Sequence, residues 1–205
     1  MIGRDGYMIP KKIHYCWFGK GKKSKLALKC IRSWRQYCPE YEVIEWNEEN
    51  FDIDMNGYTR MCYAEKKYAY LSDYVRLWVV EKYGGIYFDT DVEVIRSLEE
   101  LLRNDAFFCF ENKQYVDSGL GFGSVAHGKV IQAMLKEYEI LLDGKNGVRM
   151  CPKLNTQALV ALGLKQNGRK QNVCEAVIYP MDVLNPYNSA TGKLEKTENT
   201  FSIHW

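Results

Sequence analysis

The fold is decided by residues 72–91, which read SDYVRLWVVEKYGGIYFDTD. Ser72 is a residue type favoured immediately before the first turn of a helix, so we expect a helix over residues 73–83. Gly84 and Gly85 then end this helix, because glycine readily adopts the left-handed conformation found at helix ends. The segment therefore predicts a helix that stops abruptly.

Two carboxylates follow the expected helix end. Residues 86–88 predict a short apolar strand, and Asp89 and Asp91 come directly after it. Residues two apart in extended backbone point to the same side. Neighbouring carboxylates repel one another, and a divalent cation compensates this repulsion. Mg²⁺ or Mn²⁺ fits, because these ions take one or two carboxylates and fill other positions with phosphate oxygens and water. A solvated turn is the alternative, and the preceding strand and helix stop favour the metal.

Asp73 and Arg76 lie three residues apart in the expected helix and share one face. One interpretation is a surface ion pair, worth roughly 0.3–0.5 kcal/mol. The other is that Arg76 binds a diphosphate through its forked donors and Asp73 accepts hydrogen bonds from sugar hydroxyls. The spacing alone favours the ion pair.

The rest of the chain predicts an α/β fold. A strand at 12–18, a helix at 24–37 and a strand at 41–46 form a β-α-β opening, which indicates parallel strands. Further strands are expected at 92–95, 107–110, 120–125, 176–179 and 201–204, and further helices at 128–142 and 155–163. We expect residues 1–7 to be a loose leader and residues 8–205 to form one domain.

Composition excludes several classes of protein. Apolar residues are 46% and charged residues 26% of the 205, which is typical of a globular chain. A formal net charge of +2 gives no indication of nucleic acid binding. No segment has the length of a signal peptide core or a membrane span. The seven cysteines include no CxxC pair, which argues against zinc and favours a reducing, cytoplasmic location.

Several motifs together resemble the DXD-containing sugar transferases. These are SDYVR (72–76) with YGGIYFDTD (83–91), the opening IPKKIHYCWFG (9–19), CIRSW (30–34) and the tail TENTFSIHW (197–205). The family includes bacterial capsular polysaccharide synthesis proteins and fungal initiating α-1,6-mannosyltransferases, and it is distantly similar to glucosylating clostridial toxins. The central motif is specific, whereas each flanking match is weak alone.

The resemblance implies a GT-A fold, which is Rossmann-like with a mixed, mainly parallel central sheet. It also implies retaining transfer of a hexose from a nucleotide sugar, with a UDP-sugar favoured over GDP-mannose, and Mn²⁺ or Mg²⁺ as cofactor. The acceptor it implies is a glycan or a lipid-linked polysaccharide, as in capsule biosynthesis. The location would be cytoplasmic, at the inner face of the cell membrane, where a peripheral association is left open.

The resemblance also assigns roles to individual residues. Asp89 and Asp91 would hold the metal and the diphosphate, Asp73 and Arg76 would contact the donor, Trp17 would stack on the nucleotide base, Tyr87 would line the donor pocket, and His204 would complete the metal shell. Family members continue past the position of Trp205, so we leave open whether the domain is truncated there. Core packing remains the alternative for Trp17 and Tyr87.

Two other functions remain open. One is a non-catalytic module that binds a nucleotide or glycan, and the other is a metal-dependent hydrolase of nucleotides or nucleotide sugars. A P-loop motif is absent from the sequence, which argues against a phosphotransferase. Three loop residues, Glu111, Asn112 and Asp117, border the sugar or acceptor on one interpretation and lie exposed on the favoured one.

Overall fold

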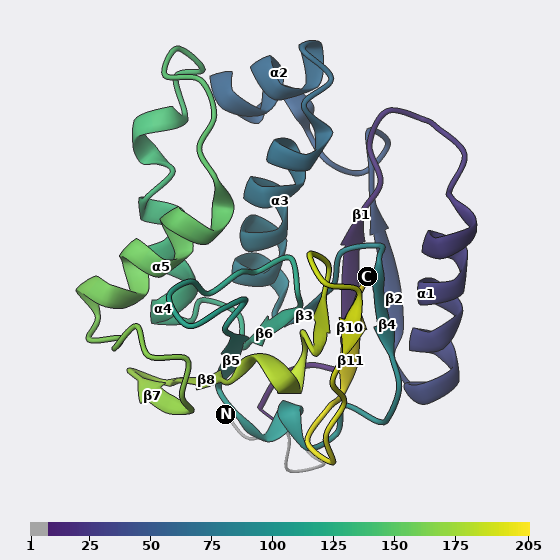
Figure 1. Cartoon of the computed structure of the whole chain (residues 1–205). Helices are drawn as coiled ribbons and strands as arrows, with labels where there is room; N and C mark the ends of the chain where they lie inside the picture. The colour runs from purple at the N-terminus through teal and green to yellow at the C-terminus, as the bar shows by residue number, and fades with distance from the viewer. Residues whose placement is uncertain (1–7) are drawn as a thin grey trace.

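The computed structural model describes residues 8–205, so the expected leader at residues 1–7 lies outside the described part (Figure 1). Its centre is a seven-stranded sheet with the order β2-β1-β3-β6-β5-β8-β7. The strands are β1 (Lys12–Cys16), β2 (Glu42–Trp46), β3 (Gly85–Tyr87), β5 (Ala106–Cys109), β6 (Phe122–Ser124), β7 (Gln171–Val173) and β8 (Ala176–Tyr179).

The sheet is mixed. Strand β1 pairs in parallel with both β2 and β3, and β5 pairs in parallel with β8. Strand β6 lies antiparallel between β3 and β5, and β7 is antiparallel to β8. Five of the seven strands therefore run in one direction, which confirms the expected mixed, mainly parallel sheet.

Helices cover both faces of the sheet (Figure 1). The helix α1 (Lys25–Tyr37) lies on one face. On the other face lie α3 (Tyr68–Tyr83), α4 (Lys129–Lys136) and α5 (Cys151–Ala161), with α2 (Gly57–Ala64) packed against α3.

Strand β1 shows how the sequence builds these two layers. Ile13 and Tyr15 belong to the apolar cluster on the α1 side, whereas Cys16 belongs to the cluster on the α3 side. This alternation follows from the two-residue period of a strand. On the α1 side, the fully buried Trp34 donates its indole N–H to the carbonyl of Val92 at 2.8 Å.

A small second sheet brings the last described residues next to the acidic motif. Strand β11 (Ser202–His204) pairs antiparallel with β4 (Val92–Val94), and His204 lies opposite Val92. Another two-stranded sheet joins β9 (Tyr187–Asn188) and β10 (Lys193–Leu194). Short 3₁₀ helices occupy Ile53–Met55, Leu101–Arg103, Glu139–Leu141 and Met181–Val183.

The expected start of the central helix is wrong. Helix α3 begins at Tyr68, with Lys67 as its N-cap, so Ser72 lies inside the helix. Packing explains the extra turn, because Leu71 is fully buried and the ring of Tyr68 packs against that of Tyr63, with the ring centres 5.7 Å apart. Tertiary contacts of this kind override a local capping preference.

Other boundaries also differ. Gly84 has a φ of 62° and Gly85 of 115°, which confirms that they end the helix. The helix expected at 128–142 is divided into α4 and a 3₁₀ turn, and the one expected at 155–163 begins at Cys151. All seven cysteines are free, and no helix among residues 8–205 has the length and apolarity to cross a membrane.

Candidate active site

The candidate site lies at the carboxyl ends of two neighbouring parallel strands, β1 and β3. Ligands of open α/β sheets bind at such ends, near a point where strand order reverses. Here the antiparallel β6 adjoins β3 on the side away from β1. A cavity of about 340 Å³ opens at this place and is lined by Cys16, Trp17, Phe18, Tyr68, Ala69, Ser72, Arg76, Asp89, Thr90 and Asp91.

Arg76 is the buried cation of the site. It is 3% exposed, and its Nη2 atom lies 2.9 Å from Asp73 Oδ1 and 3.0 Å from Asp89 Oδ1. Its Nε donates to the carbonyl of Ser72 at 3.2 Å, and its guanidinium lies 5.0 Å from the Tyr87 ring centre. The ion pair with Asp73 was expected at the surface; it is instead buried and joins helix α3 to the acidic motif.

Asp89 is fixed on two sides. The Tyr87 hydroxyl donates to Asp89 Oδ1 at 3.0 Å, and Arg76 pairs with the same oxygen. Burial raises the pKa of Asp89, and Arg76 opposes this rise by stabilising the carboxylate. Burial also raises the pKa of Asp73, to about 7, because the Arg76 charge compensates it incompletely. Two carboxylates therefore share one guanidinium.

Asp91 faces the last strand. His204 Nε2 lies 3.4 Å from Asp91 Oδ1, and the Trp205 amide donates to the Asp91 carbonyl at 3.1 Å. Burial alone would raise the pKa of Asp91, but His204 produces a net lowering. Burial alone would lower the pKa of His204, and Asp91 produces a net rise. The His204 contact with Asp91 Oδ1 does not have hydrogen-bond geometry, so this buried oxygen has no hydrogen-bond donor.

The donor set fits a divalent cation that a diphosphate helps to bind. No group of three or more His, Cys, Asp or Glu side chains within residues 8–205 is arranged to hold a metal ion unaided. The orphaned Asp91 oxygen and the Asp89 carboxylate nevertheless line one cavity. Carboxylate oxygens are the ligands that Mg²⁺ and Mn²⁺ prefer, and these ions commonly leave several positions to phosphate and water.

The two aromatic candidates are placed differently. Trp17 lines the cavity, its indole N–H donates to the carbonyl of Gly21 at 2.7 Å, and the Lys23 ammonium lies 5.4 Å from its ring centre. Tyr87 is 1% exposed and lies behind Asp89 instead of lining the cavity. Its hydroxyl positions the Asp89 carboxylate.

Two residues of the following loop also shape the site. A Cβ atom on Gly119 would lie 2.7 Å from Asp89 Oδ2 and 3.0 Å from Arg76 Nη1, so these groups fit only against a glycine. Asp117 accepts a hydrogen bond from the Gly119 amide at 2.9 Å and raises the pKa values of Asp73 and Asp89. The favoured interpretation placed Asp117 in an exposed loop, whereas the structure places it half-buried next to Gly119 and close to the carboxylates of the site.

Comparisons with known proteins agree with this geometry. Residues 24–108 match the family described as "Glycosyltransferase sugar-binding region containing DXD motif". The chain is 32% identical over 106 residues to inositol phosphoceramide mannosyltransferase 3 of Schizosaccharomyces pombe (strain 972 / ATCC 24843). That match includes 48% of this chain and 29% of the yeast protein, so the chain spans less than a third of its relative's length.

Solved structures show the same fold at low sequence identity. The PaToxG glycosyltransferase superposes with a TM-score of 0.60 at 19% identity, covering 75% of this chain and 68% of that one. A glycosyltransferase involved in glycosylation of the major capsid of PBCV-1 gives 0.52 at 10% identity, covering 94% and 92%. The UDP-bound glycosyltransferase domain of the YGT toxin gives 0.51 at 12% identity, covering 78% and 69%. The expected GT-A fold is therefore confirmed.

Proposed function

We infer from the match of residues 24–108 to the glycosyltransferase sugar-binding region containing the DXD motif that this chain transfers a sugar from a nucleotide-sugar donor. The observation that carries the proposal is the cavity in which Asp89, Asp91 and Arg76 meet. Two carboxylates and one guanidinium match a donor that arrives as a metal-bound diphosphate. We propose that residues 8–205 form one domain with this activity.

Cleavage of the bond between sugar C1 and phosphate leaves positive charge on the sugar and negative charge on the departing diphosphate. Asp89 and Asp91 would hold a divalent cation, which supplies charge stabilisation to the diphosphate when bound. Arg76 is already fixed by Asp73 and Asp89, so it needs little reorganisation to face the developing charge. Asp73, which pairs with Arg76, would accept hydrogen bonds from sugar hydroxyls.

We propose that Trp17 stacks on the base of the nucleotide. Its indole N–H is already bonded to Gly21, which fixes the ring at the edge of the cavity before a ligand arrives. His204 would complete the metal shell from β11, where its Nε2 already faces Asp91. Trp17 lines the cavity directly, whereas His204 reaches it only through its contact with Asp91, and these two placements support the proposed roles.

A UDP-sugar with a hexose is our preferred donor, with GDP-mannose as the alternative. The similar toxin domain that binds UDP supports the first, and the yeast mannosyltransferase supports the second. A thermal-shift experiment distinguishes them, because a ligand that binds the native state raises its melting temperature. We expect the largest rise for a UDP-hexose with Mn²⁺ and little rise when EDTA replaces the metal.

Turnover separates the proposal from its alternatives. Release of free hexose and UDP in the absence of an acceptor is the expected slow reaction, and a faster reaction with an added glycan identifies a transferase. Binding of the nucleotide sugar without turnover would favour a binding module, and water as the preferred acceptor would favour a hydrolase. The anomeric configuration of the product, measured by NMR, tests the proposed retention.

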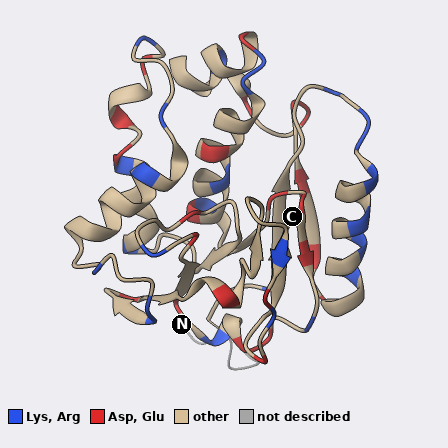
Figure 2. Ribbon diagram, in the orientation of Figure 1, with Lys and Arg blue, Asp and Glu red and all other residues tan. Residues whose placement is uncertain are grey.

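The proposed acceptor is a glycan or a lipid-linked saccharide at the inner face of the cell membrane. The basic loop at residues 19–25 leads into α1, whose outer surface carries Lys25, Lys29, Arg32 and Arg35 (Figure 2). Cations at this density attract anionic lipid headgroups. Co-sedimentation with vesicles containing 30 mol% phosphatidylglycerol tests the association, and equal sedimentation with neutral phosphatidylcholine vesicles would contradict it.

A further inference from the structure

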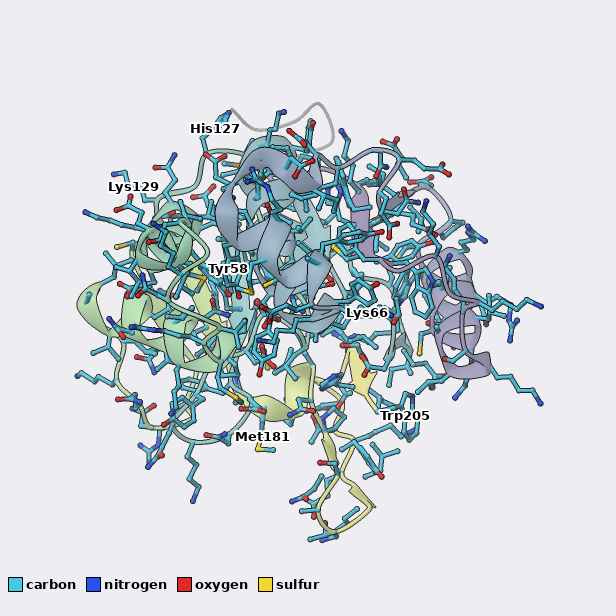
Figure 3. The ribbon with its side chains drawn as sticks, turned by 90° about the horizontal axis from the view of Figure 1, so that it is seen from above. Tyr58, Lys66, His127, Lys129, Met181 and Trp205 are labelled. Carbon is cyan, nitrogen blue, oxygen red and sulfur yellow. The ribbon has the colours of Figure 1, made fainter. Side chains whose placement is uncertain are left out.

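The cavity of about 340 Å³ that Asp89 and Asp91 line is called the donor cavity below. A second cavity of about 290 Å³ lies on the other side of His204 from it. It is lined by Glu111, Asn112, Met181, Asn185, Tyr187, Asn188, Ser189, His204 and Trp205. Figure 3 shows Met181 and Trp205 along the same edge of the molecule, away from His127 and Lys129. His204 borders this cavity and at the same time lies 3.4 Å from Asp91 of the donor cavity, so the two cavities are neighbours.

The lining residues distinguish the ligand chemistry of the two cavities. The donor cavity contains the guanidinium of Arg76, whereas none of the residues that line the second cavity is a lysine or arginine. The second cavity instead carries a carboxylate, three asparagine amides, hydroxyl groups and two aromatic rings, and its one basic group, His204, already faces Asp91. This set disfavours a phosphate and suits a neutral molecule with many hydroxyl groups and an apolar ring face.

The polar groups are fixed before any ligand binds. The Asn112 side-chain amide donates to Glu111 Oε2 at 3.2 Å, and that of Asn185 donates to the Glu111 carbonyl at 3.2 Å. The Asn188 side-chain oxygen accepts from the amides of Ala190 and Thr191 at 3.0 and 3.1 Å. Groups held in this way lose little conformational entropy on binding.

The aromatic wall is fixed as well. The Trp205 indole N–H donates to Glu93 Oε2 at 2.9 Å, and the Lys29 ammonium lies 4.9 Å from the indole ring centre. The Tyr187 ring packs against Trp205 with centroids 5.4 Å apart. A rigid aromatic surface of this kind can pack against the C–H face of a pyranose ring.

We propose that the second cavity binds the acceptor as a neutral hexopyranose ring, beside the donor cavity across the contact between Asp91 and His204. The proposal rests on the proposed transferase function and adds the position and chemical class of the acceptor. A ring seated against Trp205 would lie next to the donor cavity, with His204 between them.

The test measures binding first and transfer second. The probes are methyl α-D-glucopyranoside, methyl α-D-mannopyranoside and methyl β-D-galactopyranoside, observed by saturation-transfer NMR with the full chain, UDP and Mg²⁺. We expect at least one probe to show saturation transfer with the natural chain. Ser189→Trp and Met181→Trp fill the cavity from different segments, and each should lower that signal at least fivefold.

Ala190→Trp is the matched control, because Ala190 is exposed next to Ser189 and does not line the cavity. This variant should keep the signal of the natural chain, and equal melting temperatures would show that all three variants fold. With a UDP-hexose as donor, Ser189→Trp should lower transfer to the bound hexoside at least tenfold relative to donor hydrolysis.

The proposal is overturned if no hexoside gives a signal with the natural chain, or if the filled and control variants give equal signals. Failure of the transferase function would look different. In that case the natural chain would not bind or turn over any nucleotide sugar, whatever the hexoside signals show.

Discussion

Asp89 and Asp91 contribute to folding differently, although the motif presents them as a pair. Replacing either with Asn keeps the shape of the side chain and removes its negative charge. Asp89 is 28% exposed on its side chain and pairs with the buried Arg76, whereas Asp91 is 41% exposed and has a longer contact with His204. We therefore expect Asp89→Asn to destabilise the fold and Asp91→Asn to leave its stability nearly unchanged.

The magnitude follows from the partners that remain. Removing one member of a fully buried ion pair costs about 3–5 kcal/mol. Arg76 keeps its 2.9 Å contact with Asp73, and Asp89 is partly solvated, so we expect a loss of about 2 kcal/mol for Asp89→Asn. Asp91→Asn should cost about 0.5 kcal/mol or less, as for surface pairs. In a chain of this length, 2 kcal/mol lowers the melting temperature by about 4–8 °C.

Two measurements check this prediction. Urea denaturation at pH 7.5 without metal gives the free energy of unfolding of each variant, and Mn²⁺-dependent hydrolysis of a UDP-hexose gives its activity. Both variants should lose activity by about a hundredfold or more, because each removes charge that holds the cation. Equal destabilisation by the two substitutions would refute the structural difference, and full metal-dependent activity in either would refute its role in holding the metal.

Three further predictions follow from the same region and from the core. Gly119→Ala should lower activity more than tenfold with a loss of about 1–3 kcal/mol in stability, since its Cβ would displace Asp89 and Arg76; a fully active variant would contradict the close approach. Arg76→Lys should fold but lose turnover, because an ammonium cannot reproduce the contacts of the guanidinium with two carboxylates; unchanged kcat would show that Arg76 is structural. Burial lowers the pKa of His14 from 6.5 to about 4, so the unfolded chain binds the proton more tightly than the folded chain does. The free energy of unfolding should therefore fall by about 3 kcal/mol as the pH drops from about 6.5 to 4. His14→Gln should remove this pH dependence, as measured by urea denaturation. The quantity to compare is the difference in free energy of unfolding between the two proteins at each pH, because the raised pKa of Asp73 makes stability change in the opposite direction in both of them.

The neutral state of His14 follows from its two ring contacts. Its Nε2 lies 2.9 Å from the carbonyl of Gly84 and acts as donor there, while Nδ1 accepts from the Trp46 indole N–H at 3.1 Å. A second proton on Nδ1 would face the indole donor. Protonation therefore breaks a hydrogen bond in the core, which agrees with the direction of the pKa change.

Local patterns predicted the parts of the fold that depend on neighbouring residues. The glycines at 84 and 85, the short strand after them and the acidic pair follow from backbone preferences over a few residues. The alternation in β1 likewise follows from the period of a strand. The start of α3 could not be predicted in this way, because Leu71 and Tyr68 are held by side chains of other segments.

The candidate site needed long-range information that spacing does not carry. The pairing of β11 with β4 joins residues more than a hundred positions apart and places His204 at Asp91. The sequence alone favoured a surface pair for Asp73 and Arg76, whereas Arg76 is buried and also binds Asp89. Family resemblance indicated which residues matter, and the structure adds how Tyr87 and Gly119 position them.

Charge balance explains why this arrangement suits a metal-bound diphosphate better than a free one. Asp89 and Asp117 act electrostatically on Asp73, and Asp91 and Asp117 act on Asp89, close to a single guanidinium and His204. Burial is the largest cause of the raised pKa values of Asp73 and Asp89, and the neighbouring negative charges add to it. Four carboxylates near one guanidinium and one imidazole leave an excess of negative charge. A free diphosphate would add to this excess, whereas a diphosphate that arrives with a divalent cation reduces it. Binding of the donor and of the cation should therefore be mutually dependent, which is why the EDTA arm of the thermal-shift experiment is the decisive comparison.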